Sequence, residues 1–213
     1  RLAKPDWKLQ LFAGFNHQVQ WGGERKRWGD GFDLSPLETV FYVATGKAYG
    51  GTGTSIPRSK IGNHQGSIDI GASYDFGDFS VMAYRQNVYD VGALSKLANI
   101  RDGLNGITFT NNNYRKIKSK NFDWHKLLLE FFYSKDQAGY PWSKPTASGD
   151  EDYYNNSEYL EGWSYLDKGM GTPLIVSALS ARPGQANHPS DFFISNRVVA
   201  GHIGASGQVY GWN

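Results

Sequence analysis

The sequence contains no cysteine, so it can form neither a disulfide framework nor a thiolate metal site. It also lacks a long apolar run. The longest uncharged apolar stretch, residues 171–181, is interrupted by Pro173 and is shorter than the ~20 residues of a membrane-spanning helix. Neither sign of charge dominates, since 22 Lys and Arg face 20 Asp and Glu. No overall positive field therefore favours nucleic acid as a partner.

Aromatic residues and glycine are abundant instead. The chain has 13 Tyr, 12 Phe, 7 Trp and 26 Gly, whereas hydrophobic residues make up only 39% and the mean hydropathy is −0.53. Compact soluble cores are normally filled by Leu, Ile and Val, whereas Tyr, Trp, Gly and Asn suit many strands, many turns and aromatic rings at a membrane interface. Because no segment suits a spanning helix, a membrane location would require a β-barrel.

The strongest local pattern is a period of two over residues 7–21, which predicts one long strand. At roughly 3.3 Å per residue and a tilt of about 40°, this strand would rise about 35 Å, with a tryptophan near each membrane interface. A long edge strand of a soluble sandwich shows the same alternation and is the alternative. The odd positions carry Trp7, Leu9, Leu11, Ala13, Phe15, His17, Val19 and Trp21.

Further strands are predicted along the chain. Alternation over residues 67–76 and 79–89, separated by Gly77-Asp78, indicates a hairpin. Residues 122–134 fit a strand, although Lys126 and Glu130 are four apart and a helix competes. Weaker patterns predict strands at residues 103–110, 174–179 and 198–212. We expect an all-β fold, namely an antiparallel transmembrane outer-membrane β-barrel or a portion of a larger one.

The connections between these strands differ in length. Long ones are residues 22–66, with a short strand inside, 90–102 and 135–172, whereas short ones are Gly77-Asp78 and residues 111–121. Consecutive antiparallel strands place alternate connections on opposite sides, so the long connections share one side and the short turns the other. Outer-membrane barrels show this asymmetry, with long extracellular loops and short periplasmic turns. We therefore predict that the short turns face the periplasm.

Residues 153–163 combine aromatic rings with amide groups. Aromatic faces stack on the apolar C–H faces of sugar rings, and amides hydrogen-bond to hydroxyl groups. Tyr and Asn also favour loops, so sugar binding and a plain loop both fit. The residues that would bind a polysaccharide are Tyr153, Tyr154, Asn155, Asn156, Tyr159 and Trp163.

Motifs for catalysis or metal binding are missing from the sequence. The five histidines form no H-x-x-x-H pair, and there is no G-x-S-x-G motif. The carboxylates of residues 150–152 fit a solvated acidic loop better than a calcium site. Serine, histidine and asparagine could still meet in a barrel wall and form a hydrolase, because spatial triads need no local motif. We expect no catalytic residue, no metal and no cofactor.

Several runs of the sequence resemble the Bacteroidetes branch of the Wzi-type capsule assembly proteins. They are residues 66–71 (GSIDIG), 99–104 (NIRDGL), 129–131 (LEF), 135–139 (KDQAG), 152–156 (DYYNN), 162–165 (GWSY) and 171–174 (GTPL). The resemblance implies a closed barrel in the bacterial outer membrane, without enzymatic activity, which helps attach capsular polysaccharide through its extracellular face. Its partners would be extracellular polysaccharide and outer-membrane lipid.

Members of that family are longer chains. The sequence begins without Met or an apolar signal segment, which also indicates a processed protein or a stretch of a longer one. We expect residues 1–213 to form a single β-barrel domain, part of a longer chain, with about eight to ten strands at roughly 20–25 residues per strand and connection. Two alternatives to polysaccharide attachment are a barrel scaffold that docks other envelope proteins and a barrel hydrolase.

Overall fold

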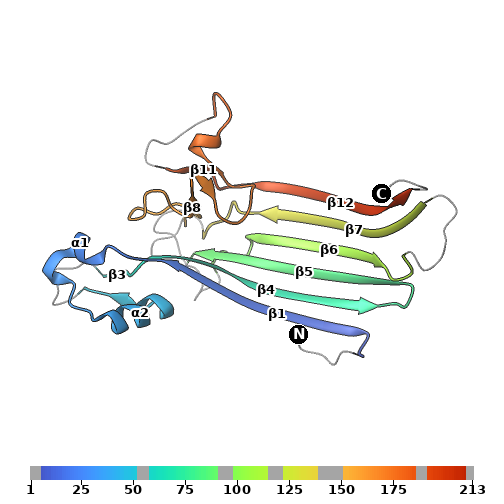
Figure 1. Ribbon diagram of the computed structural model, residues 1–213, viewed down its shortest axis with the longest axis horizontal. Coiled ribbons are helices and arrows are strands. Elements are labelled where there is room, and N and C mark those ends of the chain that lie inside the picture. The colour runs from blue at the N-terminus through green and yellow to red at the C-terminus, as the bar shows by residue number, and fades with distance from the viewer. Residues whose placement is uncertain are drawn as a thin grey trace.

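The computed structural model describes residues 6–51, 58–90, 98–114, 122–138, 151–185 and 191–209. One antiparallel sheet of six strands dominates them, in the order β1-β4-β5-β6-β7-β12 (Figure 1). Its strands are β1 (Leu9–Gln20), β4 (Asn63–Asp75), β5 (Phe79–Asp90), β6 (Gly103–Asn111), β7 (Phe122–Tyr133) and β12 (Val199–Val209). The prediction of an all-β fold with antiparallel strands is confirmed, whereas the barrel and its place in a membrane stay predictions. β1 and β12 form the two edges, and no pairing closes the sheet within the described ranges.

These strands lie where alternation predicted them. β1 falls within residues 7–21, β4 and β5 form the hairpin around Gly77-Asp78, and β12 falls within residues 198–212, of which 210–212 lie outside the described residues. β7 shows that residues 122–134 form a strand and not a helix. It pairs with β6 on one side and β12 on the other, so neighbouring strands bind its backbone amides and carbonyls.

The register places apolar side chains in rows that cross all six strands. Because side chains alternate along a strand, residues paired across the sheet share a face. One row is Leu11, Ala72, Ala83, Ile107, Leu129 and Ile203, and the next is Leu9, Tyr74, Val81, Phe109, Leu127 and Ala205. We call the surface formed by these rows the apolar face. Most of its large side chains are exposed, among them Leu9, Leu11, Phe15, Ile70, Leu127, Leu129, Phe131 and Ile203.

The opposite surface, which we call the polar face, carries amides, hydroxyls, carboxylates and many glycines. One of its rows is Phe12, Gly71, Tyr84, Gly106, Glu130 and His202. The glycines leave room for large neighbours: a Cβ atom at Gly106 would lie 2.2 Å from Cζ of Tyr84. The odd positions of residues 9–19 and 127–133 thus share one face, as predicted, while Lys126 and Glu130 lie on the other.

The connections are sorted by length, as predicted. The two shorter connections, from β4 to β5 and from β6 to β7, leave the strands at one end of the sheet, the turn end, where the backbone N–H of Asn112 donates to the carbonyl of Asp78. The described residues of 21–62, 91–102 and 134–198 lie at the other end, the loop end, where Figure 1 shows the helices and the small strands together. Which end faces the periplasm stays a prediction.

The described residues of 21–62 form a small folded unit, the helical insert, where we expected a loop with one short strand. It contains α1 (Glu24–Trp28), η1 (Gly29–Gly31), α2 (Pro36–Thr45), β2 (Ala48–Tyr49) and β3 (Ser59–Lys60). A capping box begins α2, since Ser35 accepts from the N–H of Glu38, whose carboxylate accepts from the N–H of Ser35. Phe32, Val43 and Ile61 form its core.

No helix in the described ranges is both long and apolar enough to cross a membrane.

A strand at residues 174–179 was predicted wrongly. Only β10 (Val176–Ser177) is extended there, paired with β11 (Phe193–Ser195) and followed by η2 (Ala178–Ser180). The chain turns just before it, where the N–H of Ile175 donates to the carbonyl of Thr172, and the Ile175 side chain is buried in the aromatic cluster of the cap. With β8 (Ser164–Tyr165) and β9 (Lys168–Gly169), these elements belong to the cap, which we define as the described residues of 151–198.

Candidate functional site

A buried carboxylate anchors the cap to the loop end of the sheet. Asp102 precedes β6 and is fully buried. It accepts hydrogen bonds from the backbone N–H groups of Asp136 and Gln137, at 2.9 and 2.7 Å, and from the hydroxyl of Tyr153 at 2.7 Å. Burial raises the pKa of Asp102, while these three donors oppose the shift because they favour the charged form. One side chain thus joins three segments that are distant in the sequence.

Two asparagines hold the segment around Asp102 in place. The Asn87 side-chain amide donates to the carbonyls of Asp102, at 2.6 Å, and Asn99, at 3.3 Å. The Asn99 amide donates to the carbonyl of Val88 and to the hydroxyl of Tyr153, both at 2.7 Å. The Tyr153 hydroxyl therefore accepts one hydrogen bond and donates another. Buried networks in which every member is satisfied are rigid, so this junction fixes the cap.

Gln137 and Asn196 extend the network to the start of β12. The Gln137 amide nitrogen donates to the carbonyls of Ser134 and Asn196, at 2.9 and 3.1 Å, and its amide oxygen accepts from the N–H of Tyr153 at 3.1 Å. The Asn196 amide donates to the carbonyl of Tyr153 at 2.9 Å and to the carboxylate of Asp152. Both ends of the connection between β7 and β12 are thus tied to Tyr153.

The structure brings the six predicted sugar-binding residues together in the cap, but several of their side chains are buried in its interior. Tyr153, Tyr154 and Trp163 are buried in an aromatic core with Ile175 and Phe193. Burial strongly raises the pKa of Tyr153, and the charge of Asp102 adds to the shift. The ring faces of Tyr153 and Trp163 therefore contribute to the packing of the cap.

The other predicted residues shape the backbone of the cap. The Asn155 side chain pairs with the backbone of Phe193, donating to its carbonyl at 2.9 Å and accepting from its N–H at 2.8 Å. Asn156 accepts from the N–H groups of Glu158 and Tyr159 and so closes a turn. Tyr159 is half-buried, and burial raises the pKa of its hydroxyl to about 12. Binding of a polysaccharide by the six residues stays a prediction.

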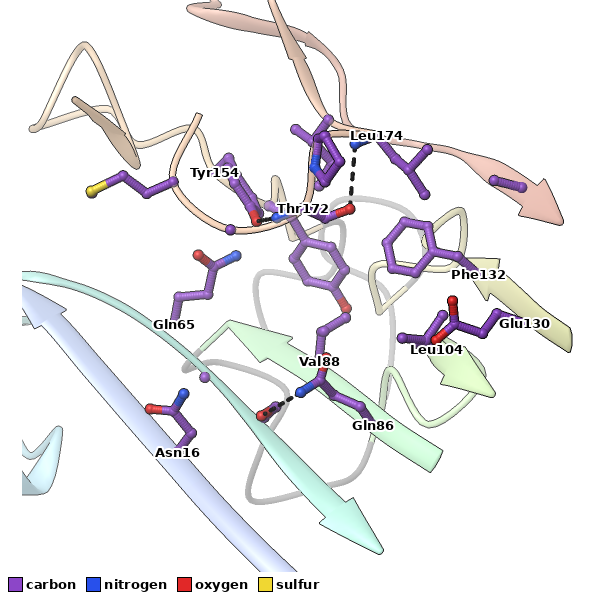
Figure 2. Close-up of a pocket in the computed structure, with 18 of the residues that line it drawn as sticks. Asn16, Gln65, Gln86, Val88, Leu104, Glu130, Phe132, Tyr154, Thr172 and Leu174 are labelled. Carbon is purple, nitrogen blue, oxygen red and sulfur yellow. Dashed lines mark hydrogen bonds between the residues drawn. The ribbon is translucent and has the colours of Figure 1, made fainter. Parts of the chain in front are cut away.

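A cavity of about 630 Å³ lies between the cap and the polar face of the sheet (Figure 2). Its floor comes from β1, β4, β5, β6, β7 and β12, and its roof from residues 153–154 and 170–175. Tyr154 belongs to the roof, and its hydroxyl accepts a hydrogen bond from the N–H of Thr172 at 3.0 Å. The polar lining residues include Asn16, Gln18, Gln65, Ser67, Gln86, Glu130, Thr172 and His202.

Glu130 supplies the carboxylate in the lining. The hydroxyl of Tyr84 donates to one carboxylate oxygen, and Nδ1 of His202 lies 2.9 Å from the other. Apolar side chains lie beside this group, with Leu104 and Phe132 on the floor and Leu174 in the roof (Figure 2). The alternation of residues 7–21 and 127–133 assigned Gln18 and Glu130 to the polar face, but it could not show that the cap would cover them.

The chemistry of the cavity suits a hydrated, polyhydroxylated molecule. Its volume lies within the roughly 300–1,000 Å³ of ligand pockets. Amides and a fixed carboxylate can hydrogen-bond to hydroxyl groups, while apolar walls can contact the C–H faces of sugar rings. In the part of the chain that the structure describes, no group of three or more His, Cys, Asp or Glu residues is placed to hold a metal ion.

A serine–histidine pair lies elsewhere on the sheet. Oγ of Ser206 lies 3.5 Å from Nδ1 of His125, whose ring stacks on Tyr114. A hydrolase triad also needs a carboxylate or amide that orients the histidine. No such group contacts His125 among residues 98–114, 122–138 and the other described ranges. Enzymatic activity therefore gains no specific support from this pair.

Comparison of the chain with models of protein families, with curated proteins and with solved structures found no match.

Proposed function

We propose that this chain forms part of the wall of an outer-membrane β-barrel that helps attach or assemble a surface polysaccharide without catalysing a reaction. The apolar face carries this proposal. Two adjacent rows of apolar side chains cross all six strands, and most of their large members are exposed. Soluble monomers rarely expose contiguous apolar patches above about a few hundred Å². Lipid is the solvent in which such a face is stable.

The strand lengths and the aromatic residues support the same location. A tilted barrel strand needs about 9–11 residues to cross the hydrocarbon, and β1, β4, β5 and β7 have 12 or 13. Exposed Trp7 and Trp21 flank β1. At the turn end, Phe76 packs against Tyr74 and Phe79, with ring centroids 4.7 and 4.9 Å apart. Aromatic rings gather at both interfaces of outer-membrane barrels.

The cavity supplies a place for the polysaccharide. It lies on the polar face, which in a barrel faces the aqueous interior, and at the loop end, which in our topology is extracellular. A closed barrel would need β1 to pair with β12 or further strands to pair with both edges. Asp102, Gln137 and Tyr153, which anchor the cap, belong to sequence runs that resemble the capsule assembly family.

A capsule-retention experiment tests this function. Gln65 and Gln86 would be replaced by Met in the full protein, expressed in its encapsulated host, because Met keeps the side-chain size and removes the amide. We expect the double variant to remain in the outer-membrane fraction while cell-bound polysaccharide falls. Gln208→Met is the matched control, since Gln208 lies on β12 outside the cavity lining. Unchanged retention in the double variant would remove the cavity from the function.

The scaffold alternative is that the apolar face binds other envelope proteins. The two cases differ in what covers the apolar side chains in the native membrane. Lipid-soluble photoreactive probes should label an apolar-face position such as Leu129 if lipid covers it. Crosslinking of that position to another protein, without lipid labelling, would favour the scaffold.

A further inference from the structure

The helix α2 has two apolar sides. Val43 and the partly buried Tyr42 face the core of the helical insert. Leu37, Val40 and Phe41, spaced i, i+3 and i+4 on the other side of the helix, are 81%, 50% and 55% exposed. A surface helix of a soluble protein normally carries charged and polar residues opposite its core stripe. Apolar stripes on both sides indicate a helix that is covered on both sides.

The exposed stripe of α2 lies close to the apolar face of the sheet. Val19, which is on the apolar face of β1, packs against the core of the helical insert, so the insert lies on that side of the sheet. A surface hollow of about 390 Å³ next to α2 is lined by Trp21, at the end of β1, by Val40, and by Arg25 from α1. Figure 1 shows α2 beside the loop end of β1. Val40 of the exposed stripe and Trp21 therefore border one surface.

We infer that α2 lies in the membrane interface, with its exposed stripe among the upper acyl chains of lipid. Amphipathic interfacial helices bury an apolar face about 5–10 Å into the boundary between headgroups and chains, and tryptophan prefers the same depth. Arg25 lines the hollow, and its charge is complementary to a lipid phosphate, while the carboxylate of Glu24, which lines the same hollow, accepts from the N–H of Gly22. This inference rests on the proposed membrane location.

A lipid-quenching experiment tests it. The 213 residues contain no cysteine, so a single Cys substitution gives one labelling site in this region. Val40→Cys, Leu129→Cys and Glu161→Cys in the full protein would each be labelled with bimane and reconstituted in phosphatidylcholine–phosphatidylglycerol vesicles. Bromine would be placed either high or low on the acyl chains, and iodide would be the aqueous quencher. Resistance of the band to unfolding in cold SDS would confirm that each variant is folded.

Each labelled position has its own expected result. The Val40 label should lose most emission with bromine near the headgroups, and the Leu129 label with bromine deep in the chains. The Glu161 label, exposed on the cap, should respond to iodide alone. Quenching of the Val40 label by iodide alone would overturn the inference, as would protection from every quencher, which would mean that protein covers α2. Loss of lipid quenching at Leu129 as well would overturn the membrane location itself.

Discussion

The large sheet and the cap differ in how they satisfy their backbone hydrogen bonds and in where they place their apolar side chains. The sheet satisfies its backbone through strand pairing and leaves Leu, Phe and Ile side chains exposed on the apolar face. The cap has little regular structure, and it instead buries its aromatic rings and ties its backbone with Asn, Gln and Asp side chains. The cap resembles an ordinary domain in water, whereas the sheet resembles a protein with an apolar solvent on one side. We therefore expect different kinds of substitution to destabilise the two regions.

The largest effect is expected in the cap, from Asp102→Ala. The substitution leaves three donors without their acceptor, and each unpaired buried group costs roughly 1–3 kcal/mol. Limited proteolysis should then cut the cap while the sheet stays intact. Asp136→Ala is the control, because only the backbone of Asp136 joins the network. A cap that resists protease equally in both variants would contradict the anchoring role of Asp102.

A smaller effect is expected in the sheet, where the two faces can be compared through neighbouring residues. Leu129 lies on the apolar face and Leu128 on the polar face of β7. Arginine on the lipid side near the middle of a barrel costs about 2–4 kcal/mol, so Leu129→Arg should lower the free energy of unfolding by that amount. Guanidinium titration in bilayers measures it. Leu128→Arg should cost less, and equal losses would mean that the two faces meet similar surroundings.

The smallest effect concerns packing on the polar face. Gly106→Ala would place a methyl group against the ring of Tyr84 and displace the hydroxyl that donates to Glu130. Overpacking of this kind costs about 1–3 kcal/mol in the free energy of unfolding. At Gly204 the nearest atom to an added Cβ is 3.5 Å away, so Gly204→Ala should be almost neutral. Similar unfolding midpoints for both variants would argue against close packing of Tyr84.

The sheet could be predicted from the sequence because its information is local. Alternation over residues 7–21 gave the strand β1 and assigned each side chain to a face, and Gly77-Asp78 marked the hairpin. The helix α2 was missed although its capping box, from Ser35 to Glu38, is visible in the sequence. Apolar residues lie on both sides of α2, so its sequence lacks the polar stripe that identifies a surface helix.

The cap could not be predicted because its contacts are distant in the sequence. Tyr153 and Asn155 have the composition of a sugar-binding loop, but their surroundings are set by Asp102, 51 residues before Tyr153, and by Phe193. No pattern within a short window distinguishes a ring that stacks on a sugar from one that packs on a neighbour. The sequence indicated that these residues belong together, and the structure shows what they contact.

The link across the base of the cap has a consequence for the order of folding. Ser134 donates from Oγ to the carbonyl of Asn196 at 2.6 Å and from its N–H to the carbonyl of Val198 at 2.9 Å. These bonds bring together the two ends of a connection that would otherwise cost loop-closure entropy before β12 could reach β7. The meander from β4 to β7 needs only local pairing and can form first. We expect the folded cap to hold β12 at a high effective concentration beside β7, so that pairing of these two strands depends on the cap.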